Sequence, residues 1–399
     1  MKILQLTPFP TANPISGGQI RCHQIARTIA AAGHDVESVA IYLSSAYPNP
    51  SDIGENDIAF GPSSVGWSDE LLLNAYTDYY LGLFAIEDEA AFSTLRKIVA
   101  HFKPDLLWTE HPWLYRVACK LADSPKRVVH SSHNVEWRLK RRLLERMHLP
   151  SKTIDDIVDK IQKLEQEAAR DAGLTIACTS SDADYFRQVG GALASVVVAG
   201  NAVEPFSCAE SRVASWRTFL SRPTATLVSS SFIPNVNGFW DMMAPGLAFL
   251  RPEEKILVIG TAKDTILEVP GSKEFSLVNR ERMLTMGVLE KVDMQAAIRA
   301  SHVILLPTTD GEGSNLKTAE ALESSNYVVG TSRAFRGYED AVALDHVHIA
   351  DDAPAFRRKV RELLDAPPHK GGTPWEIRSR YYWANQLYPV VKFLDGYRA

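Results

Sequence analysis

The stretch from Val303 to Thr331 reads VILLPTTDGEGSNLKTAEALESSNYVVGT, and its pattern is strand, loop, helix and strand. The apolar run Val303–Pro307 suits a buried strand that leaves a parallel sheet. The polar run Thr308–Ser314 contains two glycines and is expected to be a loop. A short helix and the strand Tyr327–Thr331 follow. The stretch therefore predicts an α/β fold with a parallel sheet.

Two carboxylates lie in this unit, Glu312 in the loop and Glu320 in the helix, with seven residues between them. Ser314 or Asn315 can cap the helix, and Glu320 lies about five residues beyond its start, at roughly 1.5 Å for each residue. Both carboxylates can therefore face the mouth of the sheet, where α/β folds bind ligands. The first N–H groups of the helix form an anion site, to which Lys317 adds a positive charge.

The pattern EGSNLKTAEAL resembles the donor-site motif of the retaining glycosyltransferases of family 4, which have the GT-B fold. The resemblance implies that Glu312 faces the donor sugar as a catalytic residue and that Glu320 holds the nucleotide ribose. The other residues that it places around the sugar and the diphosphate are Gly313, Ser314, Asn315, Leu316 and Lys317, the last also as a catalytic residue. The alternative interpretation is an ordinary βα unit with one solvated glutamate and one glutamate on a helix face.

The family resemblance also implies an architecture of two Rossmann-like domains that face a central cleft, with a C-terminal helix that crosses back to domain one. We expect an acceptor-side domain at 1–205, a nucleotide-sugar donor domain at 206–374, and the returning helix at 375–399. A chain of 399 residues is long enough for two such domains, each with its own core.

The first residues of the chain form a βαβ pattern typical of a mononucleotide-binding half. A strand at Lys2–Thr7 is followed by Gly17, Gly18 and a helix that ends at Gly33. The resemblance implies that the two neighbouring glycines let the backbone approach the donor diphosphate, whereas the alternative is a plain turn before a helix. The GxGxxG fingerprint is absent, so a Rossmann oxidoreductase is not expected.

Three histidines lie at or near the ends of predicted strands. His133 follows the strand Arg127–Ser132, and family 4 enzymes commonly have a histidine at this place, close to the reacting sugar. The resemblance therefore gives His133 a catalytic role, such as donating a hydrogen bond to a sugar hydroxyl. His111 competes for this role, because it also follows a strand. His130 lies inside its strand and is expected to be a core histidine with satisfied hydrogen bonds.

The loop SFIPNVNG departs from the family pattern. Many members have an arginine and a lysine here that reach the donor phosphates, but this chain has Phe232 and Asn237 near those places. Cations at a leaving diphosphate stabilise its developing charge. We therefore expect Lys317 to supply the missing charge, with Arg21 or Lys263 as helpers.

A basic segment, Trp137–Lys152, has apolar residues at helical spacing. It predicts either peripheral contact with anionic lipid or a phosphate-bearing acceptor, or a solvated helix face that packs on its own domain. The net charge of −5 gives no sign of a nucleic-acid partner. Four cysteines lie far apart without a CxxC pair, as in a cytoplasmic protein with reduced thiols, so we expect neither a disulfide framework nor a metal site.

The sequence thus predicts a retaining, metal-independent glycosyltransferase. Its donor would be a nucleotide diphosphate sugar, used as co-substrate without a cofactor, and its acceptor a saccharide or a lipid-linked glycoconjugate. Retention without a double displacement needs no carboxylate nucleophile, because the leaving phosphate can take the acceptor proton on the same face. The alternatives are a non-catalytic GT-B scaffold that binds nucleotide sugar or glycan, and a nucleotide-sugar epimerase on the same fold.

Overall fold

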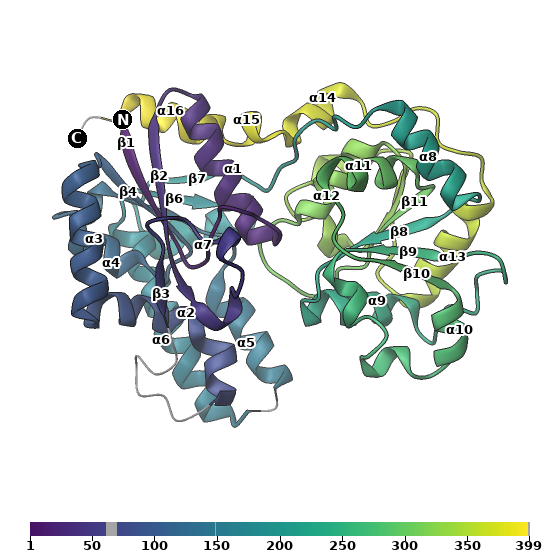
Figure 1. Cartoon of the computed structure of the whole chain (residues 1–399), viewed down its shortest axis with the longest axis horizontal. Coiled ribbons are helices and arrows are strands. Elements are labelled where there is room, and N and C mark those ends of the chain that lie inside the picture. Colours follow the sequence, from purple (N-terminus) through teal and green to yellow (C-terminus); the bar gives the residue numbers. More distant parts are fainter. Residues whose placement is uncertain (61–69, 148, 398–399) are drawn as a thin grey trace. The chain divides into compact units, whose positions relative to one another are not determined.

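The computed structural model describes residues 1–60, 70–147 and 149–397, which form two compact units (Figure 1). Unit 1 comprises Met1–Gly200 together with Trp383–Ala399, and unit 2 comprises Asn201–Tyr382. The predicted domain boundaries fall after residues 205 and 374, whereas the boundaries between the two units of the structure fall after Gly200 and Tyr382. Each unit is built on one parallel sheet, so the prediction of two Rossmann-like domains is confirmed.

Unit 1 has a seven-stranded sheet in the order β3-β2-β1-β4-β5-β6-β7. The strands are β1 (Lys2–Thr7), β2 (Asp35–Leu43), β3 (Ile58–Phe60), β4 (Leu106–Glu110), β5 (Val128–Ser131), β6 (Leu174–Ala177) and β7 (Val196–Val198). The helices are α1 (Gly17–Ala31), α2 (Glu70–Glu87), α3 (Glu89–Phe102), α4 (Tyr115–Leu121), α5 (Glu136–Arg146), α6 (Ser151–Asp171) and α7 (Ser180–Gly190). The strand order reverses between β1 and β4, and α/β folds bind ligands at such a switch point.

The start of α1 shows how local sequence sets this edge of the sheet. Ser16 caps the helix, and its hydroxyl and the Gln19 side chain form a reciprocal capping box. Cys22, Ile25 and Ile29 lie along the buried side of the helix and face the sheet. The helix N-terminus is therefore held at the carboxyl edge of β1.

The end of the chain returns to unit 1. Helix α15 (Trp383–Gln386) packs on α1, and α16 (Tyr388–Gly396) packs on β7. The side chain of Gln386 accepts a hydrogen bond from the N–H of Gly200 at 2.9 Å, which joins the tail to the last residue of the main segment of this unit.

Unit 2 has a six-stranded sheet in the order β10-β9-β8-β11-β12-β13. The strands are β8 (Ala225–Val228), β9 (Ile256–Ile259), β10 (Met283–Met286), β11 (Val303–Leu306), β12 (Tyr327–Gly330) and β13 (Val347–Ile349). The helices are α8 (Glu210–Leu220), α9 (Ile233–Met243), α10 (Ser276–Glu281), α11 (Lys291–Ala300), α12 (Leu316–Ser324), α13 (Ala353–Asp365) and α14 (Trp375–Arg378). Helices α11 and α12 cover one face of this sheet and α9 and α10 the other (Figure 1).

The predicted strand, loop, helix and strand at 303–331 are confirmed as β11, α12 and β12. All four residues of β11 are buried, as expected for a central strand of a parallel sheet. The side chain of Asn315, not that of Ser314, caps α12, because it accepts a hydrogen bond from the N–H of Lys317. The strand order of this sheet reverses between β8 and β11, so the loop after β11 lies at the switch point.

We predict that Gly238→Ala destabilises unit 2. Gly238 lies on α9 against the chain that leaves β11, and a Cβ there would lie 2.5 Å from the carbonyl oxygen of Pro307. Backbone must move to relieve this overlap, so the free energy of unfolding should fall by about 1–3 kcal/mol. Gly17→Ala is the control, because a Cβ at Gly17 meets no atom within 4 Å. Chemical denaturation checks both variants, and an unchanged Gly238→Ala protein would contradict the close approach.

Candidate functional site

The loop between β11 and α12 is a rigid turn whose backbone needs glycine. Gly311 and Gly313 have φ angles of 131° and 69°, in the region that residues with a Cβ rarely adopt. Glu312 lies between them, and its side chain is only 9% exposed. Thr309 donates a hydrogen bond to Asp241 on α9 at 3.1 Å, which ties the loop to the neighbouring helix. The position of Glu312 is therefore fixed by the backbone on both sides.

The guanidinium of Arg336 holds this loop from the carboxyl edge of β12. It donates two hydrogen bonds to the carbonyl oxygen of Gly313, at 2.6 Å and 3.2 Å, one to that of Gly311 at 3.1 Å, and one to the carboxylate of Glu312 at 3.4 Å. Arg333 adds one hydrogen bond to the carbonyl of Gly311 at 3.0 Å. Sequence reasoning missed both arginines. The sequence pattern that could have revealed them is a pair of basic residues, three positions apart, soon after the predicted strand Tyr327–Thr331.

The carbonyl oxygens of the loop accept hydrogen bonds from arginines, whereas the N–H groups at the start of α12 have no acceptor among the described residues. Within the described residues, the backbone N–H groups of Gly313, Ser314, Asn315 and Leu316 donate no hydrogen bond. The Ser314 hydroxyl itself accepts a hydrogen bond from the N–H of Asn201 at 2.8 Å, which fixes this residue. Unpaired N–H groups and the positive end of a helix dipole make a ready site for an anion.

Lys317 and Glu320 lie half-buried on α12 and line a small cavity beside the ends of β8 and β11. Burial lowers the pKa of Lys317 to about 8, against the opposing effect of Glu320. Burial likewise raises the pKa of Glu320 to about 7, although Lys317 favours its charged form. The Lys317 ammonium group lies 3.4 Å from the hydroxyl of Ser229, the residue that follows β8. Lys317 therefore reaches across the switch point of this sheet.

The loop that lacks the expected basic pair leads into α9. Phe232 precedes the helix and is 48% exposed, and Asn237 is half-buried on it. Of the two proposed helpers, Lys263 is 46% exposed in unit 2 and lies 3.7 Å from Asp264. Arg21 is a buried residue of unit 1 that donates to the carbonyl of Ala199 at 2.9 Å, so its guanidinium takes part in the core of that unit.

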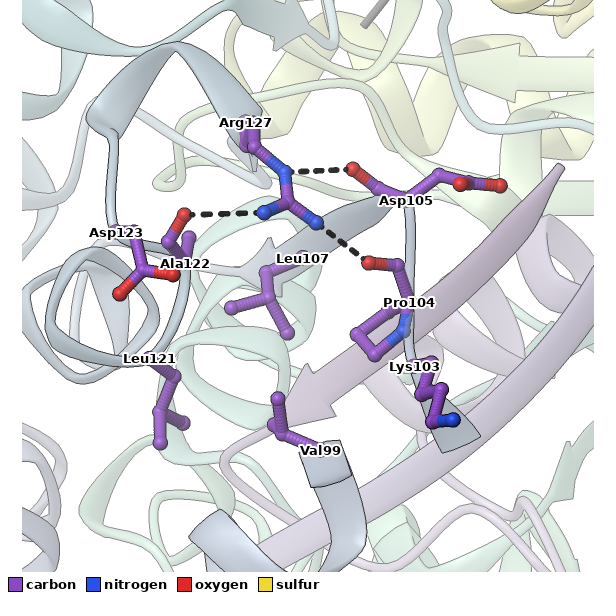
Figure 2. A pocket seen from close by; sticks show the side chains of 9 residues that line it. All are labelled: Val99, Lys103, Pro104, Asp105, Leu107, Leu121, Ala122, Asp123 and Arg127. Atoms are coloured by element: carbon purple, nitrogen blue, oxygen red, sulfur yellow. Dashed lines mark hydrogen bonds between the residues drawn. The ribbon is translucent and has the colours of Figure 1, made fainter. Parts of the chain in front are cut away.

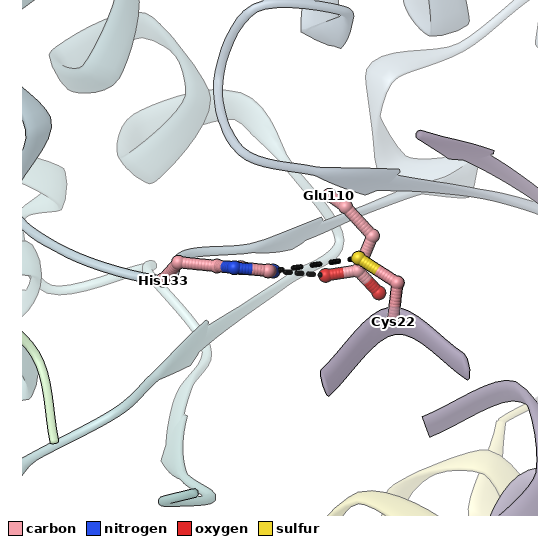
Figure 3. A group of neighbouring side chains, drawn as sticks. All are labelled: Cys22, Glu110 and His133. Atoms are coloured by element: carbon pink, nitrogen blue, oxygen red, sulfur yellow. Dashed lines mark hydrogen bonds and ion pairs between the residues drawn. The ribbon is translucent and has the colours of Figure 1, made fainter. Parts of the chain in front are cut away.

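In unit 1, His133 belongs to a buried cluster with Glu110 and Cys22 (Figure 3). The Nε2 atom of His133 lies 2.8 Å from a carboxylate oxygen of Glu110 and 3.8 Å from the sulfur of Cys22. The other carboxylate oxygen accepts hydrogen bonds from Gln5 at 2.7 Å and from Trp108 at 2.8 Å. These residues come from α1, β1, β4 and the end of β5, which sequence reasoning could not bring together.

The charges in this cluster decide the tautomer of His133. Burial raises the pKa of Glu110, but the hydrogen bond from His133 and the nearby charge of Arg21 outweigh it and hold that pKa at about 2. Burial and the nearby His111 lower the pKa of His133 to about 3. An ionised carboxylate only accepts hydrogen bonds, so the neutral imidazole donates from Nε2. The free Nδ1 atom is then an acceptor, whereas the sequence suggested a donor to a sugar hydroxyl.

His111 and His133 lie side by side at this edge, with ring centroids 3.8 Å apart. His111 has a φ of 63°, and its Nδ1 atom lies 2.8 Å from the carboxylate of Glu136. Both competing histidines are thus held by a buried glutamate, and the structure brings them together. His130 is buried in β5, but the expectation of satisfied hydrogen bonds is wrong, because neither ring nitrogen has a partner among the described residues.

Gly17 and Gly18 form the first turn of α1 near these histidines. A Cβ at Gly18 would lie 2.9 Å from the ring of Phe9, and that ring packs edge-on against His111 at 5.9 Å between centroids. Gly18 therefore has a packing reason of its own. Gly17 is exposed, with open space where a Cβ would lie.

The basic segment at 137–152 is not one helix. Helix α5 ends at Arg146 and α6 begins at Ser151, and residue 148 lies outside the described residues. Lys140 pairs with Asp78 at 2.6 Å, and Arg141 pairs with Asp155 at 2.9 Å. These two charges are therefore engaged within unit 1, which matches the interpretation of a helix face that packs on its own domain.

A larger cavity, of about 290 Å³, lies at the opposite edge of the unit 1 sheet (Figure 2). It lies where β4 begins, between the end of α3 and the end of α4. Arg127 lines it, but its guanidinium donates to the carbonyls of Pro104 at 2.6 Å, Asp105 at 3.1 Å and Ala122 at 3.5 Å. Figure 2 shows these three bonds joining the cavity wall, so Arg127 has a structural role there.

Comparison with known proteins connects this geometry to a family. Residues 16–202 match a family model described as a glycosyl transferase 4-like domain. The resemblance to family 4 that the donor loop suggested is thereby confirmed. A comparison with curated proteins finds no match.

Solved structures show that the whole chain has the GT-B fold of such enzymes. Sucrose-phosphate synthase from Thermosynechococcus elongatus superposes with a TM-score of 0.72 at 14% identity, over 99% of each chain. Anabaena HepE in complex with UDP gives a TM-score of 0.61 at 12% identity over 100% of each chain. The lipopolysaccharide glycosyltransferase WaaG gives 0.60 at 15% identity, over 100% of this chain and 96% of that one.

The matched residues make up most of unit 1, and the fold of this unit places the histidine cluster at the carboxyl edge of its sheet. No helix in the described part of the chain is long and apolar enough to cross a membrane.

We predict that Arg336→Met destabilises unit 2 more than Arg333→Met does. Loss of Arg336 leaves the carbonyl of Gly313 without a donor and that of Gly311 with Arg333 alone, at a cost of about 2–4 kcal/mol, against about 1 kcal/mol for loss of Arg333. Arg336→Lys should not restore stability, because an ammonium group lacks the planar fork that reaches both carbonyls. Chemical denaturation measures the free energies, and limited proteolysis reports opening of the loop. Equal effects of the two Met variants would contradict the role of Arg336.

Proposed function

We propose that this protein is a retaining glycosyltransferase that moves a sugar from a nucleoside diphosphate sugar to a saccharide or glycoconjugate acceptor. The observation that carries the proposal is the start of α12. There, unpaired N–H groups, the Lys317 ammonium and a braced Glu312 surround the carboxyl edge of the unit 2 sheet. This is the combination that a sugar linked to a diphosphate needs: donors for the phosphates and a fixed carboxylate for the sugar hydroxyls.

Each donor-loop residue has a defined part in this proposal. The N–H groups of Asn315 and Leu316, with the Lys317 side chain, would bind the diphosphate. The N–H groups of Gly313 and Ser314 would bind the sugar end. Farther along α12, Glu320 would accept hydrogen bonds from the ribose hydroxyls. HepE has been determined with UDP and with UDP-glucose, so uridine nucleotides are the first donors to test.

The reaction would proceed on one face of the donor sugar. The bond between the anomeric carbon and the phosphate oxygen breaks, and the acceptor oxygen bonds to the same face of that carbon. The acceptor proton passes to the departing phosphate oxygen, so no carboxylate nucleophile and no metal are needed. The protein would contribute orientation and stabilisation of the phosphate charge, which are large terms in group transfer.

Unit 1 would bind the acceptor. His133 would orient an acceptor hydroxyl through its free Nδ1 atom, because its N–H donates to Glu110. Gly17 and Gly18, at the start of α1, would let the donor diphosphate approach the backbone there, and the exposed position of Gly17 supports this role.

One observation favours a second candidate, a non-catalytic scaffold that binds nucleotide sugar. Phe232 and Asn237 stand near the places where many family members have their phosphate-binding arginine and lysine. A site with less positive charge stabilises a leaving diphosphate less, although it can still bind the nucleotide.

We predict that Glu312→Ala lowers turnover about 100-fold or more while the affinity for nucleoside diphosphate stays unchanged. The glutamate would contact the sugar and not the nucleotide, so its loss should affect the reacting state alone. Released nucleoside diphosphate and sugar products are measured for a panel of nucleotide sugars, with and without chelator. Glu281→Ala is the control, since Glu281 is a 75% exposed glutamate of the same unit.

The outcomes of this panel separate the candidates. Slow donor hydrolysis or transfer supports a transferase, an isomerised donor indicates an epimerase, and binding without turnover indicates the scaffold. Loss of all activity with chelator would contradict metal independence, and a fully active Glu312→Ala protein would contradict the assigned role. A thermal-shift series with nucleoside diphosphates gives the base preference, because ligands that bind the native state raise its stability.

We predict that affinity for a nucleotide sugar is greatest between pH 7 and 8. Glu320 has a pKa of about 7 and is ionised above that value, whereas Lys317 has a pKa of about 8 and is charged below it. Affinity should fall on the acid side as Glu320 gains a proton, and on the alkaline side as Lys317 loses one. Calorimetric titration across this range is the measurement, with Lys273→Met, an exposed lysine of unit 2, as the control.

Two variants assign the two limbs of this profile. Glu320→Gln should flatten the acid limb and Lys317→Met the alkaline limb. A profile of unchanged shape in both variants would show that these residues do not contact the donor.

A further inference from the structure

Asn201 is the first residue of unit 2, and it holds the loop between β11 and α12 through two hydrogen bonds. Its backbone N–H donates to the hydroxyl of Ser314 at 2.8 Å, and its side-chain Nδ2 donates to the carbonyl oxygen of the same residue at 2.7 Å. Both bonds end on one residue, so together they fix the orientation of Ser314 as well as its position.

The bond to the Ser314 carbonyl also sets the direction of the next N–H group. The peptide between Ser314 and Asn315 is trans, and in a trans peptide the C=O and the following N–H lie in one plane and point in opposite directions. Because the carbonyl points toward Asn201, the N–H of Asn315 points away from it. This N–H has no acceptor among the described residues, and it is one of the groups that would bind the diphosphate.

The same geometry applies one residue earlier in the loop. Arg336 donates to the carbonyl oxygen of Gly313 and thereby sets the direction of the Ser314 N–H. Arg336 and Asn201 therefore hold two successive peptide planes from two different parts of the chain. Within the described residues, the guanidinium of Arg336 makes no bond to the carbonyl of Ser314, so the second plane depends on Asn201.

The segment that carries Asn201 is itself fixed in unit 2. The carbonyl oxygen of Asn201 accepts a hydrogen bond from the hydroxyl of Tyr338 at 2.9 Å. Val203, two residues farther on, belongs to a buried apolar cluster that also contains Tyr338. The N–H of Phe206 donates to the carboxylate of Glu323 on α12 at 3.1 Å. The amide of Asn201 therefore acts on the loop from a fixed support.

An equivalent bond elsewhere in unit 2 shows what a purely structural asparagine does. The Nδ2 atom of Asn326 donates to the carbonyl oxygen of Ile298 on α11 at 2.7 Å, and both asparagines are half-buried. That bond joins two segments of the unit away from the start of α12. The carbonyl that Asn201 holds belongs instead to the peptide that leads into α12, so its bond has a second consequence.

We propose that Asn201 is a positioning residue of the donor site, which directs the N–H of Asn315 toward the donor diphosphate by holding the Ser314 carbonyl. This inference rests on the proposed function, because it requires a diphosphate at the start of α12. Asn201 does not touch the donor. It preorganises an N–H group, so that the peptide plane does not have to be ordered when the donor binds.

The test compares Asn201→Ala and Asn201→Leu with the unmodified full-length protein. Alanine removes the side chain, whereas leucine keeps its branched shape without a donor, so agreement between the two assigns the effect to the amide. Both variants should bind UDP and inorganic pyrophosphate about 10-fold more weakly in calorimetric titrations, roughly the effect of one misplaced hydrogen bond to a charged group. Pyrophosphate makes the result independent of the base that the site prefers.

Asn326→Ala is the matched control, since it removes an equivalent bond outside the donor loop. It should lower the denaturation midpoint about as much as Asn201→Ala does, but leave the affinities for UDP and pyrophosphate unchanged. Hydrogen exchange supplies a readout that a purely structural role would not alter. UDP at saturation should protect the Asn315 amide from exchange in the unmodified protein, and this protection should be lost in Asn201→Leu.

The outcomes separate this inference from the proposed function. If the unmodified protein binds neither UDP nor pyrophosphate, the donor site at α12 is wrong and the inference is wrong with it. If the unmodified protein binds them and both Asn201 variants bind them equally well, the inference is wrong while the proposed donor site stands. An equal loss of affinity in Asn326→Ala would also overturn the inference, because the effect would then follow from stability alone.

Discussion

Arg336 sets the hydrogen-bonding asymmetry of one loop, and the proposed donor site depends on this constraint. The guanidinium takes up the carbonyl oxygens of Gly311 and Gly313, while the N–H groups that follow remain available. Gly311 and Gly313 both have positive φ angles, which glycine adopts readily. A residue with a side chain would be strained by about 1–3 kcal/mol at such angles. The result is a surface of N–H groups without competing carbonyls, together with a glutamate whose position is fixed. An anion that approaches the start of α12 therefore meets N–H donors without competition from the carbonyls of the loop.

Unit 1 differs from unit 2 in that it keeps two glutamates ionised in its interior. Burial raises the pKa of Glu136, but the hydrogen bond from His111 outweighs it and holds that pKa at about 2. Glu110 is held in the same way by His133. Each carboxylate thereby orients one imidazole, and the two rings contact each other. Such buried pairs fix tautomer and direction more than they add stability, because removing charges from water is costly. The cluster is thus suited to presenting a hydrogen-bond acceptor at a fixed place.

The sequence was sufficient where the signal is local. The strand, loop and helix at 303–324 could be predicted from the hydrophobic run, the glycines and the capping residue. The family resemblance could be recognised from the spacing of Glu312 and Glu320 in the same short stretch. Contacts between distant elements could not be predicted. Arg336 reaches the loop between β11 and α12 from beyond β12, and Cys22 on α1 reaches His133, which follows β5. The periodicity of the basic segment also failed to predict that α5 ends at Arg146 and that a second helix begins at Ser151.

The absence of the family's basic pair has a physical consequence for Lys317. In the free protein, burial keeps the pKa of Lys317 near 8 and that of Glu320 near 7, so neither charge is firmly held close to neutral pH. An opposite charge within a few ångströms favours the charged form of a group. A bound diphosphate would therefore raise the pKa of Lys317, and ribose hydroxyls that donate to Glu320 would lower that of the carboxyl. The ligand would thus establish the charges that bind it. A single lysine beside a helix N-terminus can in this way replace two permanent cations, at the cost of affinity that varies with pH.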